Sequence, residues 1–277
     1  MHIRLVALDL DDTLLRSDLT ISGRNLEAIG SAIGCGIRIV LASGRTYASM
    51  KGYARLAGLE RRGEYLICSN GAELREADTG LRLETATLDP GFCRAAVGLL
   101  DAYGYPWQIY EEGTIVYSRM NPWTEADSVI TGQVARRATA ADLAFGTGTS
   151  KIVVPGDPAG IATLLPELRA AFGDKAEVLT SKPHFLEILP PGVDKGASLG
   201  KLAAHLGIER TQVMAIGDAM NDLGMIEFAG WGCAPANASR EAKAVARIVS
   251  PYTNDQDAVA SLIETMVLSG EGRRDTR

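Results

Sequence analysis

Thiol and imidazole side chains are scarce in this chain. Its 277 residues include four cysteines, at positions 35, 68, 93 and 233, and three histidines, at positions 2, 184 and 205. No CxxC pair and no HxxxH pair occurs, so the sequence gives no indication of a zinc site, a disulfide framework or a histidine-based triad. We therefore interpret the cysteines as free, buried thiols.

Long apolar runs and an excess of positive charge are also missing. No stretch approaches the roughly 18 uninterrupted apolar residues of a membrane span. The first apolar run is short, reaches acidic residues at once and is followed by no small-residue cleavage site, so we expect no signal peptide and a cytoplasmic protein. With 28 lysines and arginines against 34 acids, the formal net charge is −6, which argues against nucleic acid as a partner. A small anionic substrate is still compatible with this net charge, because the local charge at a binding site can be opposite to the net charge of the protein.

What the sequence does contain is an alternation of short apolar runs and helical patterns. The length exceeds the usual size of one domain, which indicates two domains or one core with a large insert. Strands alternating with helices indicate βαβ units and a parallel sheet, so we expect an α/β core built from residues 1–83 and 190–277. The strands expected in it are 3–10, 36–43, 65–69, 212–216, 231–234 and 246–250, and its helices are one capped by Ser22 and those at 195–206, 222–228 and 238–246.

The pattern of expected strands and helices changes between residues 84 and 189. Strand-like runs there alternate with helices without the regular βαβ order, and several aromatic residues gather in the segment. We therefore expect an α+β insert at 84–189. Its clearest expected elements are strands at 115–117, 151–154 and 185–189 and helices at 90–103 and 159–172.

Polar side chains follow three of the expected core strands, at the carboxyl ends where parallel sheets bind ligands. Carboxylates crowded at the end of a buried strand are costly unless a cation or a reaction needs them. These groups could therefore converge on one site. They are Asp9, Asp11, Asp12 and Thr13 after the first strand, Ser43, Gly44 and Arg45 after the second, and Gly217, Asp218, Asn221 and Asp222 after the fourth.

The acids among these residues fit phosphoryl chemistry. Asp9 and Asp11, together with Asp218, supply the hard oxygen ligands that Mg²⁺ prefers. Asp9 is a plausible nucleophile toward phosphorus because a carboxylate is ionised at neutral pH, and attack would give an aspartyl-phosphate. Asp11, beside it, could protonate the leaving alcohol and then deprotonate the hydrolytic water.

The remaining groups fit the binding of a phosphoryl group, whose developing negative charge needs donors and cations. Ser43 can donate a hydroxyl hydrogen bond, and Gly44 after it lets the backbone approach. Lys195, at a helix start, can supply a positive charge. Asn221 and Asp222 would position their loop and Lys195.

Taken singly, each pattern also fits an ordinary structural role. The two acids after the first strand could cap a loop, Ser43–Arg45 could be a plain turn, Lys195 could be a solvated helix residue, and the acids around Asn221 could cap a turn. The occurrence of all four patterns in this order favours one shared site.

Together these motifs resemble the haloacid dehalogenase-like (HAD) phosphohydrolase superfamily and, within it, its Cof-like branch. The resemblance rests on DLDDTLL from Asp9, LASGR from Leu41, DKG from Asp194 and GDAMNDLGM from Gly217, and it extends to SNGA from Ser69 and LEILPPGVDKG from Leu186. It implies a Rossmann-like core with a large α/β cap inserted between the second and third motifs, which corresponds to residues 84–189.

Carried over position by position, the resemblance implies a role for each motif residue. Asp9 corresponds to the nucleophile and a Mg²⁺ ligand, Asp11 to the general acid and base whose backbone carbonyl also binds the metal, and Asp218 to the remaining protein ligand. Ser43 and Lys195 fall on phosphate-binding positions, with Gly44 and Asn221 beside them. Thr13 and Asp222 fall on supporting positions.

Two positions depart from the family pattern. Family members often have glycine where this chain has Asp12, although an acid is also seen there. The usual Gly-Val-Ala-Met-Gly-Asn-Ala stretch reads Gly-Cys-Ala-Pro-Ala-Asn-Ala from Gly232, and Pro235 fixes the backbone and removes a donor. The second departure puts the shape of this loop in doubt, and with it the fit of the substrate.

The expected function is therefore a Mg²⁺-dependent phosphatase acting on a small phosphomonoester, such as a sugar phosphate or nucleotide-related metabolite, as a monomer or small homo-oligomer. A phosphotransferase or mutase using the same aspartyl-phosphate stays open, as does a phosphometabolite-binding protein without turnover. A cap that closes over the strand ends would contact the leaving group. Candidates for that contact are Arg45, Lys182, His184 and Glu187, with Trp107, Tyr110 or Trp123 as stacking surfaces, although such aromatics also suit a small core of the cap.

Overall fold

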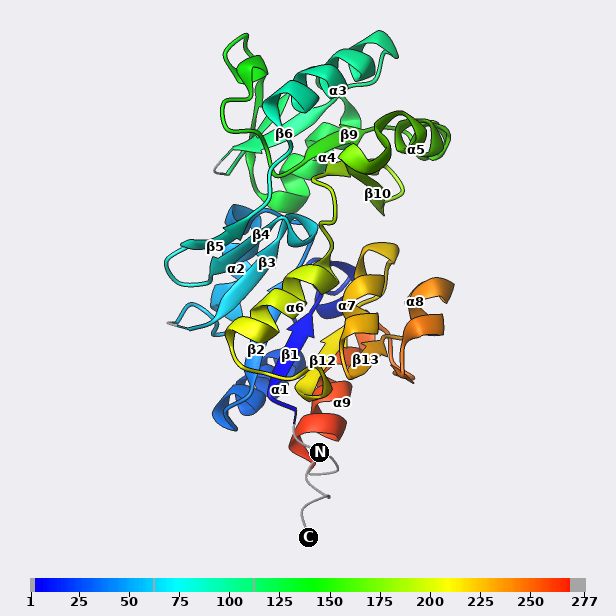
Figure 1. The fold of residues 1–277 in the computed structure, drawn as a ribbon. Coiled ribbons are helices and arrows are strands. Elements are labelled where there is room, and N and C mark those ends of the chain that lie inside the picture. The colour runs from blue at the N-terminus through cyan, green and yellow to red at the C-terminus, as the bar shows by residue number, and fades with distance from the viewer. Residues whose placement is uncertain (1–2, 62, 112, 270–277) are drawn as a thin grey trace. The chain divides into compact units, whose positions relative to one another are not determined.

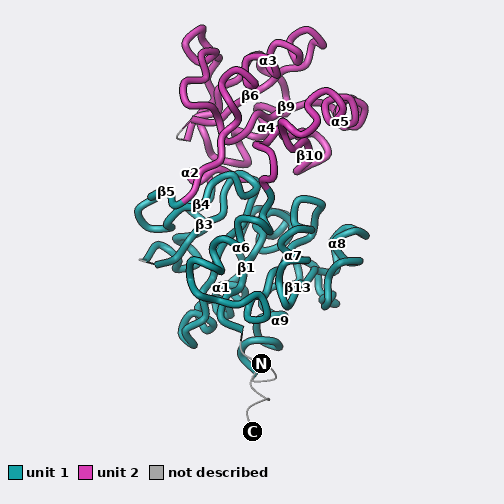
Figure 2. The backbone as a smooth tube through the Cα atoms, viewed as in Figure 1, with its two compact units in different colours: residues 1–44, 50–83, 194–277 teal, residues 45–49, 84–193 magenta. Residues whose placement is uncertain are grey.

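The computed structural model describes residues 3–61, 63–111 and 113–269, and the chain forms two compact units. The first contains residues 1–44, 50–83 and 194–277, and the second contains residues 45–49 and 84–193. Figure 2 shows the two units in different colours. The second unit is thus an insertion within the first, and the short segment 45–49 groups with it.

An eight-stranded sheet forms the centre of the first unit. Its order is β14-β13-β12-β1-β2-β3-β4-β5, and β1 pairs in parallel with β12 and β2, so the segment after the insert completes the sheet begun before it (Figure 1). The strands are β1 Leu5–Leu8, β2 Arg38–Ala42, β3 Tyr65–Cys68, β4 Glu73–Glu76, β5 Arg82–Thr85, β12 Val213–Ile216, β13 Trp231–Ala234 and β14 Ile248–Val249.

Both faces of the central strands are buried, as a parallel sheet between helices requires. All four residues of β1 are at most 1% exposed. Leu5 and Ala7 belong to a core cluster that also includes Leu199 and Leu202 of α6. The helices are α1 Gly23–Gly34, α2 Tyr47–Leu56, α6 Lys195–His205, α7 Leu223–Phe228, α8 Arg240–Val245 and α9 Ala258–Ile263.

The second unit contains a six-stranded, largely antiparallel sheet in the order β10-β11-β9-β6-β7-β8. Asp89 and Asp157 cap helices that begin with proline, the combination that favours a helix start. Its strands are β6 Gln108–Glu111, β7 Thr114–Tyr117, β8 Val134–Arg137, β9 Ile152–Pro155, β10 Glu177–Lys182 and β11 Phe185–Leu189, and its helices are α3 Pro90–Ala102, α4 Pro122–Thr131 and α5 Pro158–Phe172.

The expected fold class, an α/β core with an α+β insert, is confirmed. Some details differ: the first strand ends at Leu8 and residues Leu10–Leu14 form a wide helical turn, whereas the sequence predicted a strand through Leu10. The four cysteines are free, but Cys35 is exposed, so the expectation of a buried thiol is wrong there. Within the described part of the chain, every helix is too short or too polar to cross a bilayer.

Candidate active site

The turn that follows β1 places Asp9 at the carboxyl end of the sheet's central strand. Asp9 is 4% exposed, and its amide still donates to the carbonyl of Ile216, 3.0 Å away on β12. Beyond it the chain leaves the sheet, because Leu14 and Leu15 donate their amides to the carbonyls of Asp9 and Leu10, at 3.3 and 2.8 Å. We call residues 9–15 the Asp9 turn.

Lys195 is fully buried at the first position of α6, which Asp194 caps by accepting from the amides of Gly196 and Ala197 at 2.6 and 2.9 Å. Its Nζ donates to Oδ1 of Asp9 and to Oδ1 of Asp222, both at 2.6 Å. Lys195 and Asp9, separated by 186 positions in the sequence, are thus in direct contact. Such a cation has no packing purpose in an apolar core and is placed to balance carboxylates.

Asp222 and Asp218 complete the group of acids. Oδ2 of Asp222 accepts from the amides of Asp218 and Ala219, both at 3.0 Å, so each of its oxygens has a donor. Oδ1 of Asp218 accepts from the hydroxyl of Thr13 at 2.8 Å. One carboxylate oxygen from each of Asp9, Asp218 and Asp222 lies within 4.8 Å of the others, and we call these three residues the acid cluster.

The electrostatics of the acid cluster are unbalanced. Burial raises the pKa of Asp9 well above its ordinary value, and the charge of Asp222 raises it further. Burial and Asp222 likewise raise the pKa of Asp218 to about 7. Burial opposes the charge of Lys195, but Asp222 and Asp9 outweigh it and raise the pKa of this ammonium group. The folded protein therefore stabilises the charged lysine and resists the full ionisation of the acids around it.

A divalent cation would fit this imbalance. When all four groups are ionised, three carboxylates against one ammonium leave an excess of two negative charges, and carboxylate oxygens are the donors that Mg²⁺ prefers. Asp222 already binds Lys195 and two amides, so Asp9 and Asp218 are the carboxylates with oxygens left for a metal. The carboxylate of Asp11 is not in the group that could hold a metal. The expected ligand was the backbone carbonyl of Asp11, which stays a prediction.

The phosphate-binding candidates come from three places in the first unit, with Ser43 and Gly44 after β2, Lys195 at the start of α6 and Asn221 after β12. Ser43 is 1% exposed at the end of β2, and its carbonyl accepts from the amide of Asn70 at 3.0 Å. The side chain of Asn70 accepts from that of Asn221 at 2.9 Å, and a Cβ on Gly44 would lie 3.2 Å from it. Asn70 therefore connects three expected site residues.

Asn70 was not among the residues expected at the site. The available signal was the Asn-Gly pair in SNGA, which is typical of a turn with positive φ, and Asn70 and Gly71 have φ values of 56° and 100°. A Cβ on Gly71 would overlap the carbonyl of Asp194, so only glycine lets this turn pack against the start of α6.

The substrate candidates of the insert lie in the second unit, mostly with partners of their own. Arg45 is 6% exposed and donates to the hydroxyl of Ser49 at 3.2 Å and to the carbonyl of Ile130 at 2.9 Å. Lys182 and His184 are half-buried near the β10–β11 turn, and burial and Lys182 lower the pKa of His184.

The other candidates of the insert are buried or half-buried within it. Trp107 is 2% exposed within the core of the insert, so the stacking surface considered for it is wrong and the alternative core role holds. Glu187 forms a buried ion pair with Lys151 at 3.3 Å, and the hydroxyl of Tyr110 donates to Asp127 at 2.6 Å. Trp123 is half-buried on α4.

Comparisons with known proteins agree over most of the chain. A family model described as haloacid dehalogenase-like hydrolase matches residues 6–263. An HMP-PP phosphatase from Yersinia enterocolitica is 32% identical over 247 residues, which cover 87% of this chain and 86% of the relative. A 5-amino-6-(5-phospho-D-ribitylamino)uracil phosphatase from Bacillus subtilis is 30% identical over 270 residues, 97% of each chain. A haloacid dehalogenase-like hydrolase structure from Bacteroides thetaiotaomicron superposes with a TM-score of 0.88 at 30% identity, covering 95% of this chain and 99% of that one.

Proposed function

The chain belongs to the haloacid dehalogenase-like hydrolases, and we propose that it is a Mg²⁺-dependent phosphatase that hydrolyses a small phosphomonoester through an aspartyl-phosphate. The observation that carries the proposal is the buried Lys195, which holds Asp9 and Asp222 at 2.6 Å beside a third carboxylate. The proposal includes a small phosphorylated metabolite as partner and a cytoplasmic location.

In the proposed reaction, Asp9 attacks phosphorus while its Oδ1 is held by Lys195. As the bond from phosphorus to the leaving oxygen breaks, Asp11 donates a proton to that oxygen and the alcohol departs. Asp11 then takes a proton from water, whose oxygen attacks the aspartyl-phosphate and releases phosphate and free Asp9. Ser43, Lys195 and Asn221 bind the phosphoryl oxygens, and bound Mg²⁺ supplies charge neutralisation to the same group.

A panel of phosphorylated metabolites, assayed with Mg²⁺ and with a chromogenic aryl phosphate, tests this proposal. The panel includes HMP-PP and 5-amino-6-(5-phospho-D-ribitylamino)uracil, which the names of the two relatives give as their substrates. We expect Mg²⁺-dependent phosphate release from at least one compound. Binding without release, whichever divalent metal is added, would instead identify a binding protein, and transfer to an added sugar would identify a phosphotransferase.

The raised pKa values predict how pH controls metal binding. A carboxyl whose pKa is higher in the fold than in the unfolded chain stabilises the fold while protonated, and this contribution is lost as pH rises through the folded value. For Asp218 that value is about 7. We therefore expect the metal-free protein to lose stability as pH rises from about 4, the pKa of an unfolded aspartate, to about 7, and Mg²⁺ to raise Tm more at about pH 8 than at about pH 6 because it binds the ionised acids.

Thermal unfolding with and without Mg²⁺ across this pH range measures the effect. Asp218→Asn provides the control, because an amide has no proton to lose at this position, and its Mg²⁺-dependent shift in Tm is expected to be small at every pH. A Tm increase of equal size at both pH values in the unaltered protein would contradict the prediction.

A further inference from the structure

Two asparagine side chains from the last part of the chain hold backbone carbonyls of the Asp9 turn. Nδ2 of Asn237 donates to the carbonyl of Asp12 at 2.7 Å, and Nδ2 of Asn254 donates to the carbonyl of Leu15 at 3.0 Å. The two asparagines are linked, because the amide of Asn254 donates to Oδ1 of Asn237 at 2.9 Å. Only one orientation of the Asn237 side chain satisfies both of its partners. We call this pair the asparagine bridge.

The bridge acts on the most unusual backbone of the turn. Asp12 has φ 59° and ψ 9°, the left-handed region that side-chain-bearing residues other than asparagine and aspartate seldom enter. Since a peptide group is planar, a hydrogen bond that fixes the Asp12 carbonyl also fixes the Cα of Thr13. Thr13 in turn donates its hydroxyl to Asp218. Asn237 is therefore connected through Asp12 and Thr13 to the acid cluster.

The loop that carries Asn237 also contacts the acid cluster directly. The amide of Ser239 donates to the carbonyl of Asp218 at 2.8 Å. The carbonyl of Pro235 accepts from the amide of Ala238 at 3.1 Å, and Ala236 donates to Tyr252 at 2.8 Å. The loop with the proline departure thus forms an ordered turn that contacts both Asp12 and Asp218.

We propose that Asn237, held in place by Asn254, is a positioning residue that keeps the Asp9 turn in its working geometry. The proposal rests on the proposed function for its catalytic consequence. Asn237 is exposed, so water can replace its hydrogen bonds and its loss leaves the fold largely intact. Its contribution is instead to bias Asp12 toward the left-handed conformation, which aims Thr13 at Asp218.

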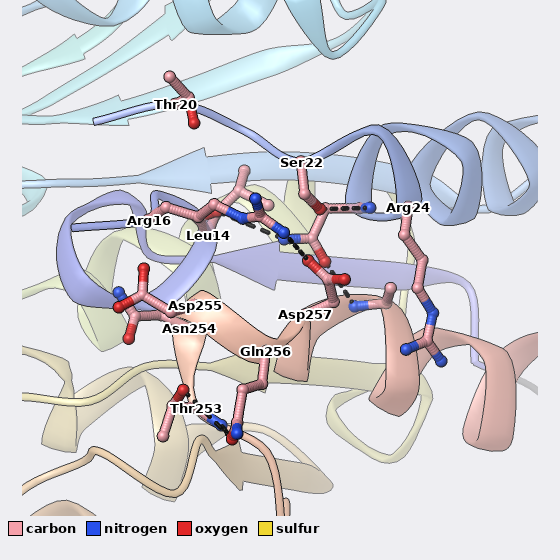
Figure 3. A network of polar contacts seen from close by, with 12 residues as sticks. Leu14, Arg16, Thr20, Ser22, Arg24, Thr253, Asn254, Asp255, Gln256 and Asp257 are labelled. Atoms are coloured by element: carbon pink, nitrogen blue, oxygen red, sulfur yellow. Dashed lines mark hydrogen bonds and ion pairs between the residues drawn. The ribbon is translucent and has the colours of Figure 1, made fainter. Parts of the chain in front are cut away.

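A neighbouring contact provides a matched control. The residue after Asn254, Asp255, accepts from the amide and the hydroxyl of Ser17 at 2.9 and 2.7 Å. Figure 3 shows Asn254, Asp255 and Asp257 beside the segment that carries Leu14 and Arg16. Asp255→Ala therefore removes a contact between the same two segments without touching the carbonyls of the Asp9 turn.

Amide hydrogen exchange tests the bridge without any substrate or metal. The amides of Leu14 and Leu15 are hydrogen-bonded inside the turn and report its opening. We expect them to exchange about tenfold faster in Asn237→Ala and in Asn254→Ala, and at the unaltered rate in Asp255→Ala. Unchanged exchange in Asn237→Ala would overturn the proposal, even if the protein proves to have no phosphatase activity.

Kinetics then distinguish positioning from a structural role. For Asn237→Ala we expect kcat to fall about tenfold with KM nearly unchanged, since the turn aims reacting groups. Glycine enters the left-handed region without penalty, so the loss should be smaller when Asn237→Ala is made in an Asp12→Gly background. An unchanged kcat, or an equal loss in both backgrounds, would overturn the positioning role while leaving the proposed function standing. Absence of phosphate release from the unaltered protein would overturn the proposed function instead.

Discussion

Asp9→Asn is expected to lower kcat for phosphate release at least about a thousandfold, or roughly 4 kcal/mol of barrier. The amide has almost the same shape as the carboxylate, but its oxygen is a poor nucleophile and cannot form the aspartyl-phosphate. Steady-state release of phosphate from the best substrate of the metabolite panel, with Mg²⁺ present, measures the loss. The change is small in volume, so it isolates the chemistry of one oxygen.

The same substitution is expected to leave the fold at least as stable as before. Burial and neighbouring acids raise the pKa of Asp9, which means that the metal-free fold favours its neutral form, and asparagine is permanently neutral. A Tm equal to or above that of the unaltered protein would therefore accompany the lost activity. Asp18→Asn, the same change at an exposed acid in the same N-terminal segment, is the control and is expected to retain activity. Substantial activity in Asp9→Asn would refute Asp9 as the nucleophile.

Lys195→Met is expected to impair both activity and stability. It removes the only ammonium group that donates to Asp9 and Asp222 in the described structure, and both carboxylates are buried. Loss of one partner from a buried ion pair leaves uncompensated charge, so we expect the free energy of unfolding to fall by about 3–5 kcal/mol. We also expect kcat to fall by about a hundredfold or more, since a cation at the phosphoryl group is lost.

Urea unfolding and phosphatase kinetics measure the two effects of Lys195→Met. Lys201→Met is the matched control, because Lys201 lies exposed on the same helix and the substitution is identical. We expect this control to change stability by less than about 0.5 kcal/mol. Stability close to that of the unaltered protein in Lys195→Met would show that the acids take up protons or a cation in place of the lysine.

Asp9→Asn and Lys195→Met are thus expected to act in opposite directions on stability although they change the two partners of the same hydrogen bond. The reason lies in the composition of the site, where three acids share one lysine. Removing one acid relieves an excess of negative charge, whereas removing the lysine increases it. This contrast is specific to a site short of positive charge and would disappear in a balanced ion pair.

Much of the parallel sheet could be predicted because its strands are short apolar runs buried on both faces. The run from Leu5 to Leu8 and the run from Val213 to Ile216 illustrate this, and they pair directly. By contrast β4 and β5, with the sequences ELRE and RLET, alternate charged and apolar residues at the partly exposed edge of the sheet. Their pairing depends on neighbours distant from any local pattern, so the sequence did not reveal them.

The residues of the candidate site likewise divide into those that the sequence reveals and those that only the structure reveals. An unusual residue at a strand end, such as Asp9, is visible in sequence because acids rarely follow a buried strand. Lys195 by itself looks like any lysine near a helix start, and only the packing of α6 over the sheet reveals that it is fully buried. The bridge of Asn237 and Asn254 is harder still, because asparagines are common in turns and both donate to backbone carbonyls. Backbone atoms carry no sequence signature.

The position of β1 between β2 and β12 has a consequence for synthesis on the ribosome. The β2 edge of this strand is paired early, but β12 begins at Val213, about 200 residues after β1, and at about 5–20 residues per second translation needs roughly 10–40 s to reach it. Throughout that interval one edge of a wholly apolar strand has no partner, and for most of it Asp9 lacks the ammonium group of Lys195, which is not yet made. The nascent chain is therefore exposed to wrong strand pairing, and a chaperone that covers apolar strands would have its main effect in this window.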